Sequence, residues 1–105
     1  MSAPDRLAML QQLAVRTPGD PFPQYGLAME LRKRGEHPGA AAAFAELALR
    51  HPAYVPCYLM YGNLLRELGR NDEAASVYER GIEAADAAGD QHAKGELQAA
   101  RAELP

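Results

Sequence analysis

The stretch from Tyr61 to Gly81, YGNLLRELGRNDEAASVYERG, decides the class of fold. It has a glycine near each end and a third at Gly69, and most of its other residues are good helix formers. A glycine between two helical runs is typical of the left-handed turn that closes a helix. The stretch shows no sustained alternation of apolar and polar residues, which a half-buried strand would need. It therefore predicts two helices joined by a tight turn at Gly69.

This helical pair recurs along the chain with a spacing of 34 residues. The shift places Pro18 on Pro52, Leu27 on Tyr61, Ala28 on Gly62, Leu31 on Leu65, Gly35 on Gly69, Ala40 on Ala74 and Phe44 on Tyr78. It also carries Leu10 onto Phe44 and Leu13 onto Leu47. The first helix therefore matches the second half of a unit, and two complete units follow it.

Capping residues give the bounds of about six expected helices in an all-α fold. Asp20 with Pro21, Asn71 and Asp90 are expected to begin helices, and Gly35, Gly69 and Gly89 to end them. The chain of 105 residues is expected to form one domain over 1–105. Its parts are a half-repeat helix at 3–18, a first repeat at 20–53, a second repeat at 54–88 and a capping helix at 90–104.

Small residues explain how the two helices of a pair come close together. Ala28 and Gly62 lie on the first helix of each pair, and Ala40 and Ala74 face them from the second helix. The rings of Phe44 and Tyr78, one turn further on, are expected to fill the space where the helices diverge. We interpret Gly81 as a contact with the following helix.

These spaced residues resemble the tetratricopeptide repeat family over nearly all of the chain. The second unit carries the family pattern at Tyr58, Tyr61, Gly62, Leu65, Gly69, Ala74, Tyr78 and Gly81. The first unit follows it less closely, with Gln24 and Leu47 at positions where the family prefers an aromatic and a small residue. The resemblance implies a right-handed superhelix of antiparallel helices that binds other proteins and is not an enzyme.

The charge of the chain argues against nucleic acid as a partner. The net charge is −3 and the isoelectric point is near 5.5, whereas a protein that neutralises many phosphates carries a surplus of positive charge. The run Arg32-Lys33-Arg34 stands at the expected end of a helix, where cations stabilise the helix dipole. No segment is apolar and long enough to suggest a membrane span or a signal peptide, so a cytoplasmic location is expected.

No arrangement of residues predicts catalysis, a metal site or a cofactor. Cys57 is the single cysteine, and it shows no metal-ligand spacing with His37, His51 or His92. Neither serine has a histidine at helical spacing that could act as its base. We expect no catalytic residues, no bound metal and no cofactor.

The candidate binding site is the face that the first helices of the repeats share in such a stack, its concave surface. Its residues are Phe22, Tyr25, Met29, Arg32, Leu59, Asn63 and Arg66. One interpretation is an open groove with basic edges that holds an acidic segment of a partner protein. The other is burial of Phe22 and Tyr25 beneath the terminal helices. Family members that clamp a peptide's terminal carboxylate use lysine and asparagine here, and only Asn63 matches, so that activity is not expected.

An alternative function is that of a structural module that associates with itself through the flank of its first helix. The chain is expected to be a monomer or a weak homodimer. In the first helix Leu7, Leu10 and Ala14 form one apolar stripe, and Met9 and Leu13 extend it to a second side. That second side could bind another copy of the chain. The last helix is polar on its outer side, as expected of a helix that ends a stack.

Overall fold

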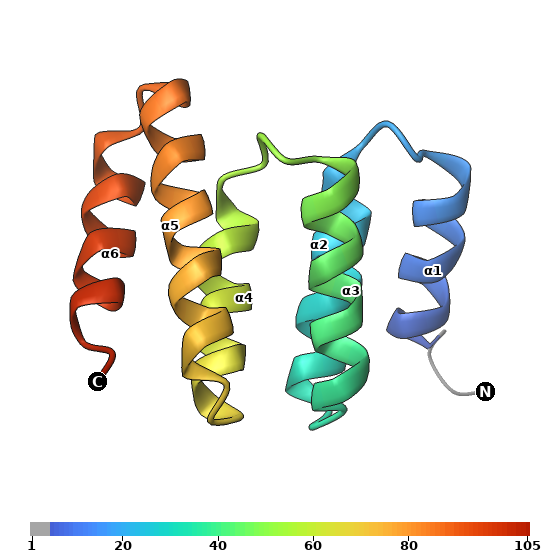
Figure 1. Ribbon diagram of the computed structural model, residues 1–105. Helices are drawn as coiled ribbons and strands as arrows, with labels where there is room; N and C mark the ends of the chain where they lie inside the picture. The colour runs from blue at the N-terminus through green and yellow to red at the C-terminus, as the bar shows by residue number, and fades with distance from the viewer. Residues whose placement is uncertain (1–4) are drawn as a thin grey trace. The chain divides into compact units, whose positions relative to one another are not determined.

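A computed structural model describes residues 5–105, and within them the chain forms six α-helices and no strand (Figure 1). The helices are α1 (Arg6–Arg16), α2 (Pro21–Lys33), α3 (His37–Arg50), α4 (Pro56–Glu67), α5 (Asn71–Ala88) and α6 (Gln91–Ala102). The expected all-α fold with about six helices is confirmed. The start of the first helix, expected at residue 3, lies outside the described residues.

The chain divides into two compact units, Met1–Leu47 and Ala48–Pro105. The boundary falls inside α3, so the first unit holds α1, α2 and most of α3. The second unit holds the end of α3 together with α4, α5 and α6. The expectation of one domain over 1–105 stays a prediction, and each unit is described by itself.

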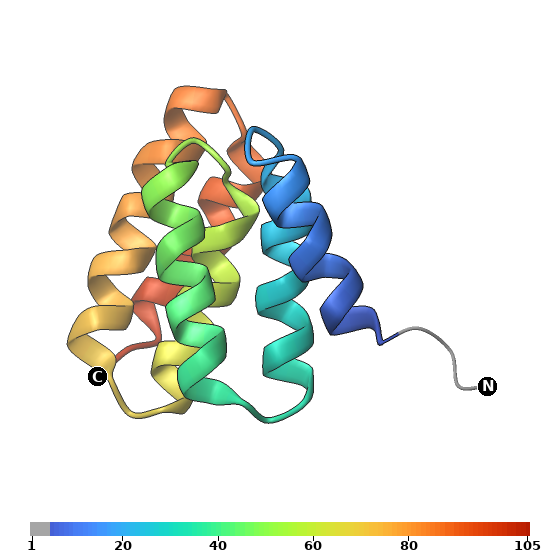
Figure 2. The same ribbon diagram turned by 90° about the vertical axis from the view of Figure 1, so that its right-hand side faces the viewer.

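In the first unit, α1 lies against α2 through Leu10, the one buried residue of α1 (Figure 2). Gly26 makes room for this side chain, because a Cβ atom on Gly26 would lie 2.9 Å from Leu10 Cδ2. The predicted cap at Asp20 is confirmed, since its carboxylate accepts a hydrogen bond of 3.0 Å from the Phe22 N–H. The predicted left-handed turn at Gly35 is also confirmed, with φ at 78°.

In the second unit, α5 contacts both α4 and α6 (Figure 1). Its packing on α4 depends on the small residue predicted there, since a Cβ on Gly62 would lie 2.3 Å from Tyr78 Cε1. The Tyr78 ring is fully buried, as expected of the residue that fills the space between the helices. Its hydroxyl donates a hydrogen bond of 2.6 Å to the Asn63 side-chain oxygen.

Gly81 is the point where three helices of the second unit meet. A Cβ at this position would lie 2.5 Å from Tyr58 Cβ in α4 and 3.0 Å from Leu97 Cδ2 in α6. The interpretation of Gly81 as a contact with the following helix is therefore confirmed, and α4 shares that contact. Leu97 is the buried residue of α6 and fills the space that the glycine leaves.

Two of the expected helix bounds are wrong. Asn71 is the first residue of α5 rather than its cap, and Arg70 precedes the helix without a side-chain capping bond. Arg70 instead holds Glu73 through two contacts of 2.5 and 2.7 Å, which tie the first turn of α5 together from outside the helix. The last helix ends at Ala102 rather than near Leu104. Its start is as predicted, because the Asp90 carboxylate accepts a hydrogen bond of 3.0 Å from the Ala93 N–H.

Candidate functional site

On α2, one of the four predicted site residues is exposed and the other three are half-buried. Phe22, in the first turn, is 67% exposed although it is a large apolar side chain. Tyr25 is half-buried, and its ring meets the buried Phe44 ring edge to face, with 6.4 Å between the centroids. Met29 and Arg32 are also half-buried. Burial beneath a terminal helix therefore does not apply to Phe22, whereas Tyr25 is partly a core residue.

On α4 the predicted site residues have partners within the second unit. Leu59 is half-buried. Asn63 is half-buried, and its side-chain oxygen is the acceptor for the Tyr78 hydroxyl. Arg66 is exposed, and its Nη1 lies 3.0 Å from Glu103 Oε2, just beyond the end of α6. The guanidinium at this position therefore already holds a carboxylate in a surface ion pair.

The seven predicted site residues belong to two compact units, four to the first and three to the second. The expectation that they line one surface stays a prediction. Within each unit, one of the predicted residues is exposed. These are Phe22 on α2, which is apolar, and Arg66 on α4, which is charged.

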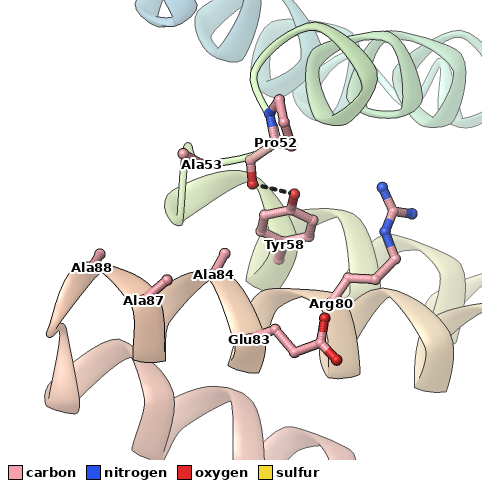
Figure 3. A pocket seen from close by; sticks show the side chains of 8 residues that line it. All are labelled: Pro52, Ala53, Tyr58, Arg80, Glu83, Ala84, Ala87 and Ala88. Carbon is pink, nitrogen blue, oxygen red and sulfur yellow. Dashed lines mark hydrogen bonds between the residues drawn. The ribbon is translucent and has the colours of Figure 1, made fainter.

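A hollow of about 540 Å³ in the second unit was not expected from the sequence (Figure 3). Its walls are Pro52, Ala53, Tyr58, Arg80, Glu83, Ala84, Ala87 and Ala88. The Tyr58 hydroxyl donates a hydrogen bond of 2.5 Å to the Pro52 carbonyl, which fixes the loop before α4 at one side of the hollow (Figure 3). The Arg80 guanidinium lies 5.6 Å from the centre of the Tyr58 ring, within the range of a cation–π contact.

One sequence signal could have indicated this hollow. Ala84, Ala87 and Ala88 follow one another at helical spacing, and small residues at such spacing leave a shallow depression on a helix. The contact between Arg80 and Tyr58 joins two helices and has no local signal. Burial raises the pKa of the Tyr58 hydroxyl, and the nearby Arg80 charge partly opposes that effect. The hydroxyl is therefore a neutral donor that shapes the hollow.

Within residues 5–105, no group of three or more histidine, cysteine, aspartate and glutamate residues could hold a metal ion. Cys57 is buried, and this burial raises the pKa of its thiol to about 12. His92 lies on the surface with its Nε2 3.2 Å from Glu96 Oε1. In the described part of the chain, no helix combines the length and the apolar character that crossing a membrane requires.

Two solved structures of a tetratricopeptide repeat domain protein from Salinibacter ruber are similar to this chain. The crystal structure is 40% identical over 80% of this chain and 93% of that chain, with a TM-score of 0.75. The solution NMR structure is 41% identical over 82% of this chain and 87% of that chain, with a TM-score of 0.78. No protein-family model matches the chain. No curated protein matches it either.

The repeated helical pairs of the chain agree with its similarity to these two tetratricopeptide repeat structures. Gly62 admits Tyr78 between the helices of the second pair, and Gly35 and Gly69 close the first helix of each pair in the left-handed conformation. The chain belongs to the tetratricopeptide repeat family, a family of protein-interaction modules.

Proposed function

We propose that this protein binds a segment of a partner protein through the outer faces of α2 and α4, and that it does so without catalysis. The observation that carries the proposal is the exposure of Phe22, at 67%. Aromatic side chains contribute much of the binding energy at protein interfaces, and burying one is favourable by roughly 1.5–3 kcal/mol. An exposed phenylalanine on the face that the repeat predicts for binding is a suitable anchor.

The backbone around Phe22 is already ordered before a partner binds. The Phe22 N–H donates a hydrogen bond of 3.0 Å to the Asp20 carboxylate. Pro21, the residue before Phe22, has its φ angle fixed by its own ring. A side chain on an ordered turn loses less conformational freedom on binding than one on a loose loop. Phe22 is therefore suited to binding in two ways, because its side chain is exposed and its backbone is already ordered.

The charges on these faces favour an acidic partner segment. Arg66 is exposed and holds the carboxylate of Glu103, so a partner carboxylate could take the place of Glu103. Arg32 and Lys33 stand in the last turn of α2. We therefore propose a partner segment with an apolar side chain for Phe22 and a carboxylate for Arg66.

The test uses Phe22 as the probe, because Tyr25 packs against Phe44 and its loss would disturb the core. A photo-crosslinking amino acid replaces Phe22 in one variant and Val15 in a control, since Val15 is 81% exposed on α1. A protein captured at position 22 and not at position 15 is then purified and titrated. We expect Phe22→Ala to weaken its binding about tenfold or more. Equal affinity for Phe22→Ala and Val15→Ala would contradict the proposed site.

A second candidate function is self-association, for which α1 gives a specific observation. Met9 is 49% exposed and Leu13 is 43% exposed, and the two lie one turn apart on the same side of α1. Sedimentation at increasing protein concentration tests this function. A constant monomer mass up to high micromolar concentration would exclude it.

A further inference from the structure

We propose that the hollow beside Tyr58 in the second unit is a further binding site, which takes an acidic segment of a partner protein (Figure 3). A carboxylate of that segment pairs with Arg80, and an apolar side chain lies over the alanines of the α5 wall. None of the seven residues predicted for binding lines this hollow. The inference is therefore independent of partner binding at Phe22.

The charge of Arg80 is not balanced by a carboxylate of the chain. Other cations of the second unit each lie within 3.2 Å of a carboxylate oxygen, namely Arg66, Arg70, Lys94 and Arg101. Within the described residues no carboxylate pairs with Arg80, and Glu83, three residues further along α5, does not do so either. The Arg80 guanidinium lies over the Tyr58 ring instead. It is therefore a cation at the wall of a hollow that is able to pair with a carboxylate from outside.

Tyr58 holds this cation in place before a partner arrives. The tyrosine is only 2% exposed, and its hydroxyl donates a hydrogen bond of 2.5 Å to the Pro52 carbonyl, so its ring is fixed at both ends. The guanidinium of Arg80 lies 5.6 Å from the centre of that ring. A guanidinium has five N–H donors, so it can bind a carboxylate through two parallel hydrogen bonds and stay over the ring. An ordered cation loses less conformational freedom on binding than a free one.

The α5 wall beyond Arg80 is apolar and low. Ala84, Ala87 and Ala88 follow Arg80 by four, seven and eight residues, and Ala87 lies about 10 Å from Arg80 along the helix axis. Methyl side chains leave room above them for a larger side chain, and burying such a side chain is favourable. The hollow therefore complements a segment that carries a carboxylate and, about 10 Å away, an apolar side chain.

Glu83 gives the segment its direction. This carboxylate is exposed on the wall, one turn of α5 before Ala87 and without an ion-pair partner among the described residues. It repels a second carboxylate placed over Ala87. The acidic residue of the segment therefore lies at the Arg80 end of the hollow and the apolar residue at the Ala87 end.

The exposure of the walls favours a segment of a protein over a free small molecule. The volume of about 540 Å³ is in the range of small-molecule pockets, but such pockets bury most of the surface of their ligand. Here Pro52 and Ala53 on one side, and Ala87 and Ala88 on the other, are exposed. A hollow with such open walls covers one side of a ligand, which is the arrangement that a chain segment needs.

Disulfide tethering tests the chemistry of the hollow with defined probes. Ala87→Cys places a thiol in the hollow, and the native Cys57 is buried. Two disulfide probes share one linker, long enough to reach Arg80, and one phenyl ring, and they end in a carboxylate or in the matched carboxamide. Ala99→Cys on α6 is the control, since Ala99 is an exposed alanine outside the hollow. Mass spectrometry measures the fraction of chain that each probe modifies at a fixed concentration of reductant.

We expect the carboxylate probe to be retained about three- to fivefold more than the carboxamide at position 87, and both equally at position 99. Arg80→Gln in the Ala87→Cys chain should remove the preference. An equal preference at the two positions overturns the proposal, and so does a preference that persists in Arg80→Gln.

Peptide selection tests whether a chain segment binds there. Random peptides displayed on phage are selected on a Phe22→Ala chain, which lacks the anchor of the proposed function, and are depleted on a Phe22→Ala/Arg80→Glu chain. Circular dichroism checks that both chains are helical. We expect the selected peptides to carry an acidic residue about three positions from a large apolar residue if extended, or about seven if helical. They should bind the Arg80→Glu chain at least tenfold more weakly.

A selection that enriches no peptides, or peptides without an acidic residue, overturns the inference. Because Phe22 is absent from both chains, neither result bears on partner binding at Phe22. Conversely, failure of the Phe22 site in its own crosslinking test leaves the two tests of the hollow unchanged.

Discussion

Two glycines inside helices of the second unit have opposite surroundings. At Gly62 an added Cβ would lie 2.3 Å from the Tyr78 ring, and that ring is fully buried with its hydroxyl fixed on Asn63. At Gly95 an added Cβ would meet nothing within 4 Å. Both residues have ordinary helical backbones, since positive φ values occur in the described chain only at Gly35, Gly69 and Gly89. The same substitution should therefore have opposite effects at the two positions.

We expect Gly62→Ala to lower the free energy of unfolding by about 1–3 kcal/mol, because the methyl group overpacks a ring that cannot move away. Gly95→Ala should raise it by about 1 kcal/mol, the usual gain of alanine over glycine in an exposed helix. Urea unfolding followed by circular dichroism, at low protein concentration, measures both. Similar shifts in the two variants would show that the packing around Tyr78 is not as described.

Cys57 gives a prediction for thiol chemistry. Burial raises the pKa of its thiol from the ordinary value of 9.0 to about 12, so the folded protein holds it neutral. We expect a thiol reagent at pH 8 to label it at least a hundredfold more slowly in the folded protein than in urea, because the thiolate is the reactive form. Rapid labelling of the folded protein would contradict this environment.

The same shift makes the stability depend on pH on the alkaline side. The unfolded chain loses the thiol proton near pH 9, while the folded chain keeps it until about pH 12. The stabilisation is therefore complete below pH 9 and is lost as the pH rises towards 12. Cys57→Ala should reduce this part of the pH dependence.

Among the helices, α1 is capped at its start by a single side chain, that of Asp5. The Asp5 carboxylate accepts a hydrogen bond of 3.0 Å from the Leu7 N–H and pairs with Arg34 at 2.7 Å, just beyond the end of α2. The hydrogen bond from Arg34 is the main cause of a lowered pKa for Asp5, and the bond from Leu7 adds to it. One side chain thus both caps α1 and ties it to α2.

We expect Asp5→Ala to increase hydrogen exchange in α1 more than Asp5→Asn does, because asparagine retains the cap and loses only the charge. Lowering the pH should act in the same direction as the asparagine variant. The ionised carboxylate stabilises α1 fully above the unfolded pKa near 3.8, and this contribution is lost as the pH falls through the lower folded value. Amide exchange measured by mass spectrometry tests the order. Equal protection in the two variants would mean that the cap contributes little.

Local signals in the sequence made most of the helices predictable. Most contacts between helices could not be predicted in the same way. Asp20, Asp90 and the glycines at 35, 69 and 89 act on their own backbone, so the sequence shows their effect directly. Asn71 misled because Arg70 and Glu73 hold the first turn of α5 through side chains, and a cap was not needed. The repeat predicted Gly62 as a small residue opposite Ala74 and Tyr78 as the ring one turn further on, whereas in the structure a Cβ on Gly62 would meet the Tyr78 ring itself. It could not indicate that Asn63 serves Tyr78, or that Arg66 holds Glu103.

For the whole molecule, the charge predicts the class of partner. A chain with a net charge of −3 has no surplus of cations with which to release counterions from a phosphate backbone. Several of its described arginines are already held by carboxylates, as Arg34, Arg66, Arg70 and Arg101 are. Proteins, rather than nucleic acids, are therefore the expected partners.

We expect the protein to cause no mobility shift of duplex DNA or of single-stranded RNA in a gel at physiological salt, at protein concentrations up to about 100 μM. This concentration matches the weakest dissociation constants of non-specific nucleic-acid binding. A lysine- and arginine-rich domain of similar size serves as the positive control. A shift that weakens as the salt concentration rises would show a basic surface that the net charge conceals.

The hydrogen bonds of two tyrosines also affect the intrinsic fluorescence by which the protein can be followed. The chain has no tryptophan and five tyrosines, so its ultraviolet emission comes from tyrosine alone. Tyr25 is the one tyrosine of the first unit, while Tyr54, Tyr58, Tyr61 and Tyr78 belong to the second. The hydroxyl groups of Tyr58 and Tyr78 donate to carbonyl oxygens of Pro52 and Asn63, an arrangement that quenches tyrosine fluorescence. We expect release of these bonds to increase the tyrosine emission, so that the intrinsic fluorescence reports the opening of the second unit without an attached dye.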